Sequence, residues 1–352
     1  MEAEERGESL RMIRDSAAGL APRTGDFKRI RALRFTVPGF DRGVWQQMAE
    51  MGWIGLRVAE DAGGSGLGMQ EFCALCEELG ASLMPEPLIP VSMAARLLPQ
   101  AALTPVLTGA RIVIPAWQER ANSYDLTGST RLSGGRLSGR KLFVPMAAGA
   151  DGFLVTVPGG LALVERDAKG LTVDIEQTQD GGHYGALSFD NVAAEAVPGD
   201  AADALDEAAL ATAAYILGAM DRAFAMTLDY LKTRQQFGRV IGTFQALQHR
   251  AADLKIHLAL TRASVEAAAA TLDTSSVPAI RRGAVSRAKA RAAESGMFVT
   301  RQCIQLHGGI GYTDEYDVGL FLRKLMLLSN LYGSAALHRA RFAAVLPETD
   351  DE

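Results

Sequence analysis

Apolar residues recur every three or four positions in the N-terminal part of the chain, which is the period of a helix with one buried face. In the segment 43–56, Trp45 and Met48 have this spacing, and the segment 70–80 repeats the pattern. Glycine- and proline-rich stretches separate such segments and favour loops. The pattern predicts a mainly helical domain over residues 1–108.

Between residues 109 and 200 the spacing changes to the two-residue alternation of β-strands. Clusters of glycine, asparagine and aspartate separate the alternating runs at short intervals, which is typical of an all-β barrel or sandwich. The predicted strands are 111–117, 136–145, 153–157, 161–165, 171–175 and 185–189. We therefore predict a separate β domain over residues 109–200.

Helical spacing returns from residue 201 to the end of the chain, now with many alanines. One apolar stripe runs along Leu210, Ala214, Leu217, Met220, Phe224, Leu228 and Leu231. Further helices are predicted at 242–272, 278–305 and 317–346. Four long helices with small residues at many contact positions predict an antiparallel four-helix bundle over 201–352. The predicted fold class is a multi-domain α+β protein with a helical domain, a β-barrel or sandwich, and this bundle.

Composition narrows the classes of function. Of the 352 residues, 48% are hydrophobic and 22% are charged, as in ordinary globular proteins. The formal net charge of -5 disfavours nucleic-acid binding, which typically uses a basic stripe. Because no apolar run reaches about 18 residues, we predict no membrane-spanning helix. The N-terminus lacks the apolar core of a signal peptide, so we expect a cytoplasmic protein.

Two motifs suggest chemistry that their surroundings do not support. Cys73 and Cys76 form a CxxC, a spacing found in redox and metal sites. They lie within the helical pattern of 70–80, and the sequence has no second CxxC, so we favour a core helix and predict no metal site. The glycine-rich segment 60–72 lacks the lysine of a phosphate-binding loop and fits no GxGxxG pattern. We predict a loop ahead of a helix that begins near Met69.

The most specific patterns are YLKTRQQFGRVIGTFQALQHRAADL at 230–254 and IQLHGGIGYTDEY at 304–316. In this order they resemble the signature regions of the acyl-CoA dehydrogenase family. The segments 52–68 and 78–88 look like the short bacterial members, especially those found as one half of a heteromeric pair. That family has the same α–β–α organisation and a comparable length, so the resemblance extends over nearly the whole chain.

The resemblance implies FAD as the cofactor and α,β-dehydrogenation of an acyl-CoA thioester to 2,3-enoyl-CoA as the reaction. In the family a carboxylate base removes an α-proton while the flavin takes a hydride from the β-carbon. Electrons then pass to an electron-transfer flavoprotein. The RxxFG segment of one subunit reaches the FAD of its neighbour, which implies a homodimer or a heterotetramer with a second acyl-CoA dehydrogenase-like subunit.

On this sequence the resemblance implies FAD contacts from Arg234, Phe237, Gln245, Gln305, Gly308 and Gly309. Arg234 would lie near the pyrophosphate, because a guanidinium can donate two hydrogen bonds to phosphate oxygens. Phe237 would lie against the adenine part. At the two glycines the missing Cβ would let backbone come close to the cofactor. Two purely structural interpretations stay open. Arg234 could be a solvated residue at a helix C-terminus, and the glycines could simply mark a break between helices.

The catalytic base is the main departure from the family. Its commoner glutamate precedes the glycine of the segment that matches 331–339, and here that position is Tyr332. A phenol with a pKa of about 10 is a poor substitute for a carboxylate. The family's other base lies early in the first bundle helix, where Glu207 is adjacent to the matched position. Glu207 is thus a candidate base, although an acidic residue near a helix N-terminus is the favoured interpretation.

The β domain departs as well. The family's glycine–serine–aspartate turn, which holds the flavin ring, has no counterpart in 113–135, and Pro145 and Met146 replace the usual aromatic or hydroxyl residues. We therefore hypothesise a partner subunit in an α2β2 assembly. Alternatives are a self-sufficient homo-oligomer that uses Glu207, a flavin-free structural partner, and a flavin monooxygenase on the same fold. By analogy with heteromeric relatives, steroid side-chain CoA esters are candidate substrates.

Overall fold

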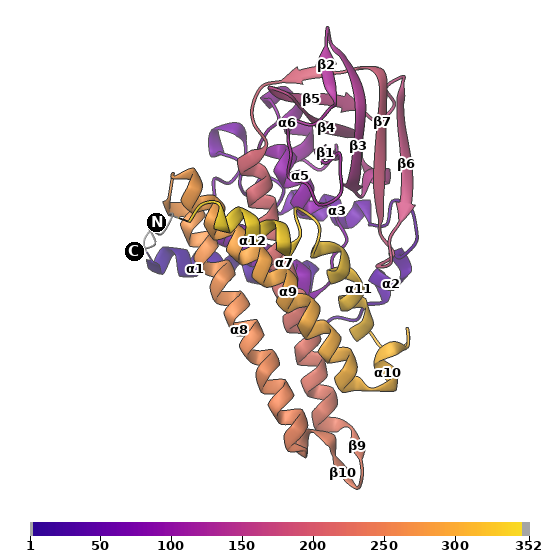
Figure 1. The fold of residues 1–352 in the computed structure, drawn as a ribbon, viewed down its shortest axis with the longest axis vertical. Helices are drawn as coiled ribbons and strands as arrows, with labels where there is room; N and C mark the ends of the chain where they lie inside the picture. The colour runs from indigo at the N-terminus through magenta and orange to yellow at the C-terminus, as the bar shows by residue number, and fades with distance from the viewer. Residues whose placement is uncertain (1–2, 347–352) are drawn as a thin grey trace, which may run out of the picture. The chain divides into compact units, whose positions relative to one another are not determined.

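Helices at both ends of the chain and strands between them follow the predicted order in the computed structural model, which describes residues 3–346 (Figure 1). The predicted α+β fold class is confirmed. Within these residues no helix is long and apolar enough to cross a membrane. The chain divides into two compact units, one made of Met1–Phe27, Met69–Met84 and Ala209–Glu352, the other of Lys28–Gly68 and Pro85–Ala208.

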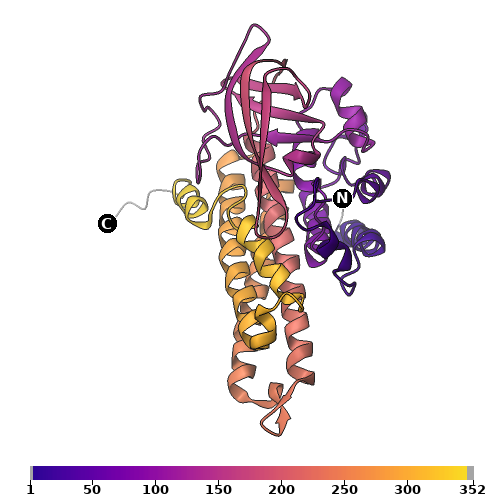
Figure 2. The ribbon, with the colours of Figure 1, turned by 90° about the vertical axis from the view of Figure 1, so that its right-hand side faces the viewer.

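Helices make up most of the first unit, and Figures 1 and 2 both show the three longest, α7, α8 and α9, side by side. The helices are α1 (Ala3–Leu20), α4 (Met69–Ala81), α7 (Ala202–Thr233, which begins in the second unit), α8 (Gln245–Thr274), α9 (Pro278–His307), α10 (Gly309–Tyr312), α11 (Val318–Leu328) and α12 (Ala335–Ala343).

The predicted single helix over 317–346 is wrong. It is interrupted between α11 and α12, because Tyr332 and Gly333 have φ values of 56° and 101°, outside the helical range.

Two glycines let α4 and α7 pack backbone against backbone. A Cβ on Gly80 would lie 2.0 Å from the carbonyl oxygen of Tyr215, and a Cβ on Gly218 would lie 1.8 Å from that of Glu77. Both distances are far below van der Waals contact, so a side chain at either position would force the helices apart. The abundance of small residues in this part of the sequence therefore serves close helix packing.

The second unit holds four short helices and the predicted β region. The helices are α2 (Lys28–Leu33), α3 (Arg42–Glu50), α5 (Leu88–Ala95) and α6 (Gln100–Leu107), with a 3-10 turn at Glu60–Ala62. Pro90 lies in the first turn of α5. Proline is tolerated there, since the first N–H groups of a helix have no intrahelical partner.

Two four-stranded sheets form the β region, with strand orders β1–β4–β5–β8 and β2–β3–β7–β6. The strands are β1 (Val113–Ala116), β2 (Arg131–Ser133), β3 (Arg136–Pro145), β4 (Gly152–Val157), β5 (Gly160–Glu165), β6 (Leu171–Gln177), β7 (His183–Ala193) and β8 (Glu195–Val197). All six predicted strands are confirmed. The two that were missed, β2 and β8, have three residues each, too few to reveal an alternation.

The CxxC motif lies in the core, as predicted. Cys73 and Cys76 are on α4 and are 5% and 0% exposed. Burial raises the pKa of the Cys76 thiol, which makes it a poor nucleophile and a poor metal ligand. The interpretation as a core helix is confirmed.

A buried carboxylate on α4 ties several helices of the first unit together. Glu77 accepts hydrogen bonds from Arg14 of α1 at 3.0 Å and from Arg262 of α8 at 2.6 Å. Arg23 adds a third contact at 3.0 Å. Burial raises the pKa of Glu77, but the hydrogen bond from Arg262 and the charge of Arg14 outweigh it and hold the pKa at about 2. The carboxylate is therefore ionised at neutral pH and stabilises the fold.

We expect Glu77→Gln to lower the free energy of unfolding at pH 7 by about 3 kcal/mol, because three guanidinium groups lose their shared counter-charge. The pKa of Glu77 in the fold lies below the reference value of 4.5. This stabilisation is thus complete above pH 4.5 and is lost as the pH falls towards 2. Urea unfolding curves across this range measure both effects.

The matched control is Glu266→Gln, since Glu266 is 65% exposed and lies 3.8 Å from Arg262. Exposed pairs of this kind contribute at most about 1 kcal/mol. Equal losses in the two variants would show that the buried cluster does not carry the stabilisation.

Candidate functional site

A short hairpin joins α7 to α8 at one end of the long helices (Figure 1). Its strands are β9 (Gln235–Gln236) and β10 (Arg239–Val240). Phe237 and Gly238 form the turn with φ values of 53° and 77°, as in tight two-residue hairpin turns. This turn leaves the Phe237 side chain 89% exposed. The exposed ring offers a large apolar contact area to a molecule outside this chain.

Aromatic contacts support this hairpin from the start of α8. The Phe237 ring lies 6.2 Å from the Phe244 ring, and the Arg239 guanidinium lies 4.0 Å from the Phe244 ring centre. Gln245 directly follows as the first residue of α8 and is exposed. The hairpin therefore presents Phe237 and Gln245, two of the predicted cofactor-contacting residues, on an outer surface.

The other motif ends α9. Gly308 has a φ of 66° and turns the chain into α10, so the break between helices is real. Gln305, Gly308 and Gly309 are all exposed. A Cβ on either glycine would meet no atom within 4 Å. The backbone here is open to a molecule outside this chain's own core.

His307 brings the two motifs together. Its ring stacks on that of Tyr230, with centroids 4.5 Å apart and planes 30° apart. Tyr316 covers it from another side, at 4.7 Å. Tyr230 lies one helical turn before Arg234, whose backbone N–H donates to the Tyr230 carbonyl at 2.9 Å. The stack thus places the end of α9 beside the end of α7.

His307 also presents a buried acceptor to this region. Its side chain lies 2.7 Å, through Nδ1, from the carbonyl of Cys303, so Nδ1 carries the proton. Burial lowers the pKa of His307, which favours the neutral ring. Nε2 is then an acceptor, and within residues 3–346 it has no hydrogen-bond partner although it is buried. An unsatisfied buried acceptor calls for a donor such as a hydroxyl or a water.

These features fit the nucleotide part of FAD. In the described part of the chain, the side chains of Arg234, Gln245 and Gln305 make no hydrogen bond or ion pair. They are therefore available to a ligand, with Arg234 suited to a phosphate and Gln245 or Gln305 to a sugar or base. The open glycine backbone allows close approach.

Tyr332 lies in the interior, not at a surface. It is 2% exposed, and its carbonyl accepts a hydrogen bond from Nε2 of the buried His338 at 2.8 Å. The position that matches the family's glutamate therefore holds a buried phenol in this chain, not a solvent-accessible carboxylate.

Glu207 is buried in the second unit and paired with two arginines. Its side chain accepts hydrogen bonds from Arg57 at 2.9 Å and 3.4 Å and from Arg96 at 3.3 Å. Arg57 in turn donates to the carbonyl of Leu67 at 2.6 Å. At the start of α7 the N–H of Ala202 donates to the carboxylate of Asp200 at 2.9 Å, so Asp200, and not Glu207, caps the helix. Both carboxylate oxygens of Glu207 are thus engaged in ion pairs.

The segment that would hold a flavin ring is occupied by contacts within the second unit. Glu119 pairs with the buried Lys141 at 2.8 Å and accepts the N–H groups of Ser129 and Thr130. Although burial raises it, the hydrogen bond from Lys141 and these N–H groups hold the pKa of Glu119 well below its usual range. The stretch that departs from the family's flavin-binding turn is therefore folded around its own ion pair.

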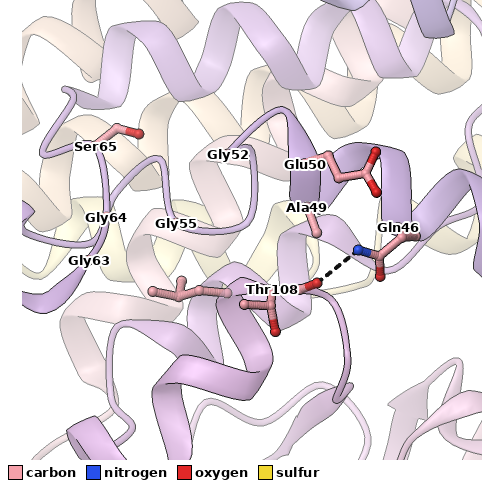
Figure 3. A pocket seen from close by; sticks show the side chains of 10 residues that line it. Gln46, Ala49, Glu50, Gly52, Gly55, Gly63, Gly64, Ser65 and Thr108 are labelled. Carbon is pink, nitrogen blue, oxygen red and sulfur yellow. Dashed lines mark hydrogen bonds between the residues drawn. The ribbon is translucent and has the colours of Figure 1, made fainter.

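A cavity of about 440 Å³ lies elsewhere in the second unit (Figure 3). Its lining is mainly backbone of glycine loops and one face of α3: Gln46, Ala49, Glu50, Gly52, Gly55, Gly63, Gly64, Ser65, Leu107 and Thr108. The predicted loop ahead of Met69 therefore contributes to a hollow, but none of the predicted site residues lines it.

Several residues around the motifs were not singled out from the sequence. Tyr316 and His307 lie inside the quoted motif, and Tyr230 lies four residues before Arg234 on the same helical face. That spacing is the signal that could have identified the stack. Lys289 and His338, which contact the segment around Tyr332, carry no such local signal.

Comparison with known proteins agrees with the motifs. A family model for the acyl-CoA dehydrogenase C-terminal domain matches residues 199–346, and one for the N-terminal domain matches 7–101. The acyl-CoA dehydrogenase IpdE2 of Mycobacterium tuberculosis is 30% identical over 335 residues, covering 94% of this chain and 93% of the relative. IpdE2 of Mycolicibacterium smegmatis is 28% identical, covering 94% of each chain.

Solved structures agree too. The Tcur3481–Tcur3483 steroid ACAD G363A variant has a TM-score of 0.87 and 32% identity, covering 96% of this chain and 98% of that one. A chain of the ChsE4–ChsE5 complex from Mycobacterium tuberculosis has a TM-score of 0.86 at 24% identity, covering 100% and 99%, and supports the fold. This chain therefore belongs to the acyl-CoA dehydrogenase family of FAD-dependent acyl-CoA oxidoreductases.

Proposed function

We propose that this chain is the partner subunit of a heteromeric acyl-CoA dehydrogenase, and that a second, homologous subunit supplies the catalytic carboxylate. The assembly oxidises an acyl-CoA thioester to 2,3-enoyl-CoA and passes electrons to an electron-transfer flavoprotein. One contrast carries the proposal. The predicted FAD-contacting residues are exposed and available, whereas Tyr332 is buried and Glu207 is held by Arg57 and Arg96.

An apolar surface on α8 and α9 supports association with such a subunit. Ile256 and Leu260 of α8 are 57% and 45% exposed, and Phe298 of α9 is 41% exposed. Phe298 lies beside His257 of α8, with ring centroids 4.7 Å apart, so these side chains belong to one surface. A homologous subunit is the occupant we propose, because the neighbouring motif residues also need one to complete their cofactor.

The chemistry of this chain lies in binding rather than proton transfer. The chemistry that FAD would supply here is acceptance of a hydride from the β-carbon of the substrate. Arg234 would neutralise the pyrophosphate and donate hydrogen bonds to it. Phe237 would cover the adenine, and the backbone at Gly308 and Gly309 would allow close contact. Nε2 of His307 would accept a hydrogen bond from a hydroxyl or a water at the same end.

A bulky polycyclic acyl group is the substrate class that we propose. The solved structure with 32% identity is named as the Tcur3481–Tcur3483 steroid ACAD. A steroid side-chain CoA ester is therefore the first substrate to test, next to a straight-chain acyl-CoA of similar carbon number.

The FAD content and the turnover of the purified complex test this proposal. Co-expressed with a homologous subunit that retains the family glutamate, the chain should co-purify as a stable complex that contains FAD and oxidises acyl-CoA. Purified alone, it should show no dehydrogenation. Flavin absorbance per protein mass and reduction of a dye acceptor measure both properties.

Other outcomes separate the alternatives. Full turnover by the chain alone would establish a self-sufficient enzyme and overturn the proposal. A colourless complex that takes up no FAD at the shared motifs would establish a structural partner. Oxygen consumption by the reduced flavin, without enoyl-CoA formation, would establish a monooxygenase.

Arg234→Gln should weaken FAD binding by the complex about 10- to 100-fold, because a charge-assisted contact to phosphate is worth about 1.5–3 kcal/mol. Phe237→Ala should weaken it as well, with little effect on folding, since its side chain is 89% exposed. Quenching of flavin fluorescence on titration with the apo-complex measures the affinity. The matched control is Arg287→Gln, an exposed arginine on α9; an equal loss there would point to general charge effects.

Glu207→Gln tests the remaining base candidate. We expect a less stable protein, by about 3 kcal/mol, because Arg57 and Arg96 lose a buried counter-charge, while turnover per folded complex stays unchanged. A base would instead lose about 100- to 10,000-fold in kcat. Thermal unfolding together with kcat of the folded fraction distinguishes the two, and a loss of kcat at unchanged stability would identify Glu207 as the base.

A further inference from the structure

Side chains from α9 and α12 hold the segment 329–334, which carries Tyr332. The Lys289 side chain on α9 is fully buried, and Nζ donates to the carbonyls of Leu328 at 3.0 Å, Ser329 at 3.2 Å and Gly333 at 3.0 Å. Burial lowers the pKa of Lys289 to about 7. The three acceptors favour the protonated form, because only the ammonium has three N–H donors.

His338 on α12 holds the same segment from a second direction. Its Nε2 lies 2.8 Å from the carbonyl of Tyr332, and its Nδ1 lies 3.3 Å from the hydroxyl of Ser286 on α9. Because a carbonyl only accepts, Nε2 must carry the proton and Nδ1 accepts from Ser286. Burial and the charge of Lys289 lower the pKa of His338 to about 3, so the neutral ring is the form present at neutral pH.

The backbone between these two contacts has a shape that few residues adopt. Tyr332 has a φ of 56° although it is not glycine, which costs about 1 kcal/mol or more. A Cβ on Gly333 would lie 2.8 Å from Nε2 of His338. The left-handed turn is therefore held by contacts on both sides, and it directs the Tyr332 side chain into the interior, where it is 2% exposed.

We infer that Lys289 and His338 are positioning residues that lock segment 329–334, so that the family's base position is closed in this chain and not merely without its carboxylate. The inference deepens the proposed function and rests on it, because a closed base position fits a chain whose base is supplied by a second subunit. Two buried side chains donate hydrogen bonds to four backbone carbonyls in this region, those of Leu328, Ser329, Tyr332 and Gly333.

Nitration of tyrosines in the full-length chain tests whether the position is closed. Tyr312 is 75% exposed and serves as an internal positive control. With tetranitromethane and peptide mass spectrometry, we expect Tyr312 to react and Tyr332 to stay unmodified in the wild type. In Lys289→Met, Tyr332 should react at least 10-fold faster than in the wild type. Nitration of wild-type Tyr332 at a rate similar to that of Tyr312 would overturn the inference.

Hydrogen exchange then distinguishes positioning from general stability. The amides of Asn330 and Leu331 donate to the carbonyl of Leu327 in α11, and that of Gly333 donates to the carbonyl of Asn330. We expect their exchange to accelerate in Lys289→Met while the amides of α7 and α8 stay protected. Uniform acceleration across the bundle, or no acceleration, would overturn the positioning role. Lys255→Met, at an exposed lysine on α8, is the matched control and should change neither readout.

A conservative pair at His338 supplies the second variant. Glutamine can place an N–H donor near the position of Nε2, whereas leucine cannot. His338→Leu should expose Tyr332 to nitration, and His338→Gln should retain most of the wild-type protection. Equal effects of the two changes would mean that the hydrogen bond to Tyr332 does not position the segment. None of these readouts needs FAD or a partner, so they stand or fall independently of the heteromeric assembly.

Discussion

The stack of His307 on Tyr230 is the contact on which the candidate cofactor site depends. Residues 230–245 and 304–309 are far apart in sequence, and the stack is what holds the two segments together at the ends of α7 and α9. The ring of His307 is buried against the half-buried rings of Tyr230 and Tyr316. At Gly308 and Gly309, which follow it, the outer surface is backbone alone.

The same contrast between inner and outer surfaces separates binding from catalysis. A cofactor motif that serves a neighbouring subunit has to face outward, and Arg234, Phe237 and Gln305 do. A base for this chain's own substrate would need a carboxylate that a ligand can reach. Glu207 is instead buried, and Arg57 and Arg96 occupy both of its carboxylate oxygens. Exposure therefore favours a binding role, and burial argues against a catalytic one.

Local patterns predicted those parts of the fold that local patterns control. Alternation located every strand of β3 to β7, and helical spacing located α4, α7, α8 and α9. The two sequence motifs identified the exposed residues of the candidate site. Contacts between distant positions could not be predicted in this way. Arg57 and Arg96 pair with Glu207 although they are 150 and 111 residues away in the sequence. No local pattern around Glu207 predicts these two partners.

The break between α11 and α12 shows where local and long-range information meet. The dipeptide at Tyr332 and Gly333 is a weak local signal, because a single glycine within a helical pattern is tolerated at a cost of about 1 kcal/mol. What decides the conformation is Lys289, since a buried amine must find acceptors and the end of α11 offers two carbonyls that no helix satisfies. Continuing the helix through 329–334 would consume those carbonyls and strand the lysine. The demand of one buried donor group thus sets the end of a helix, and with it the interior place of Tyr332.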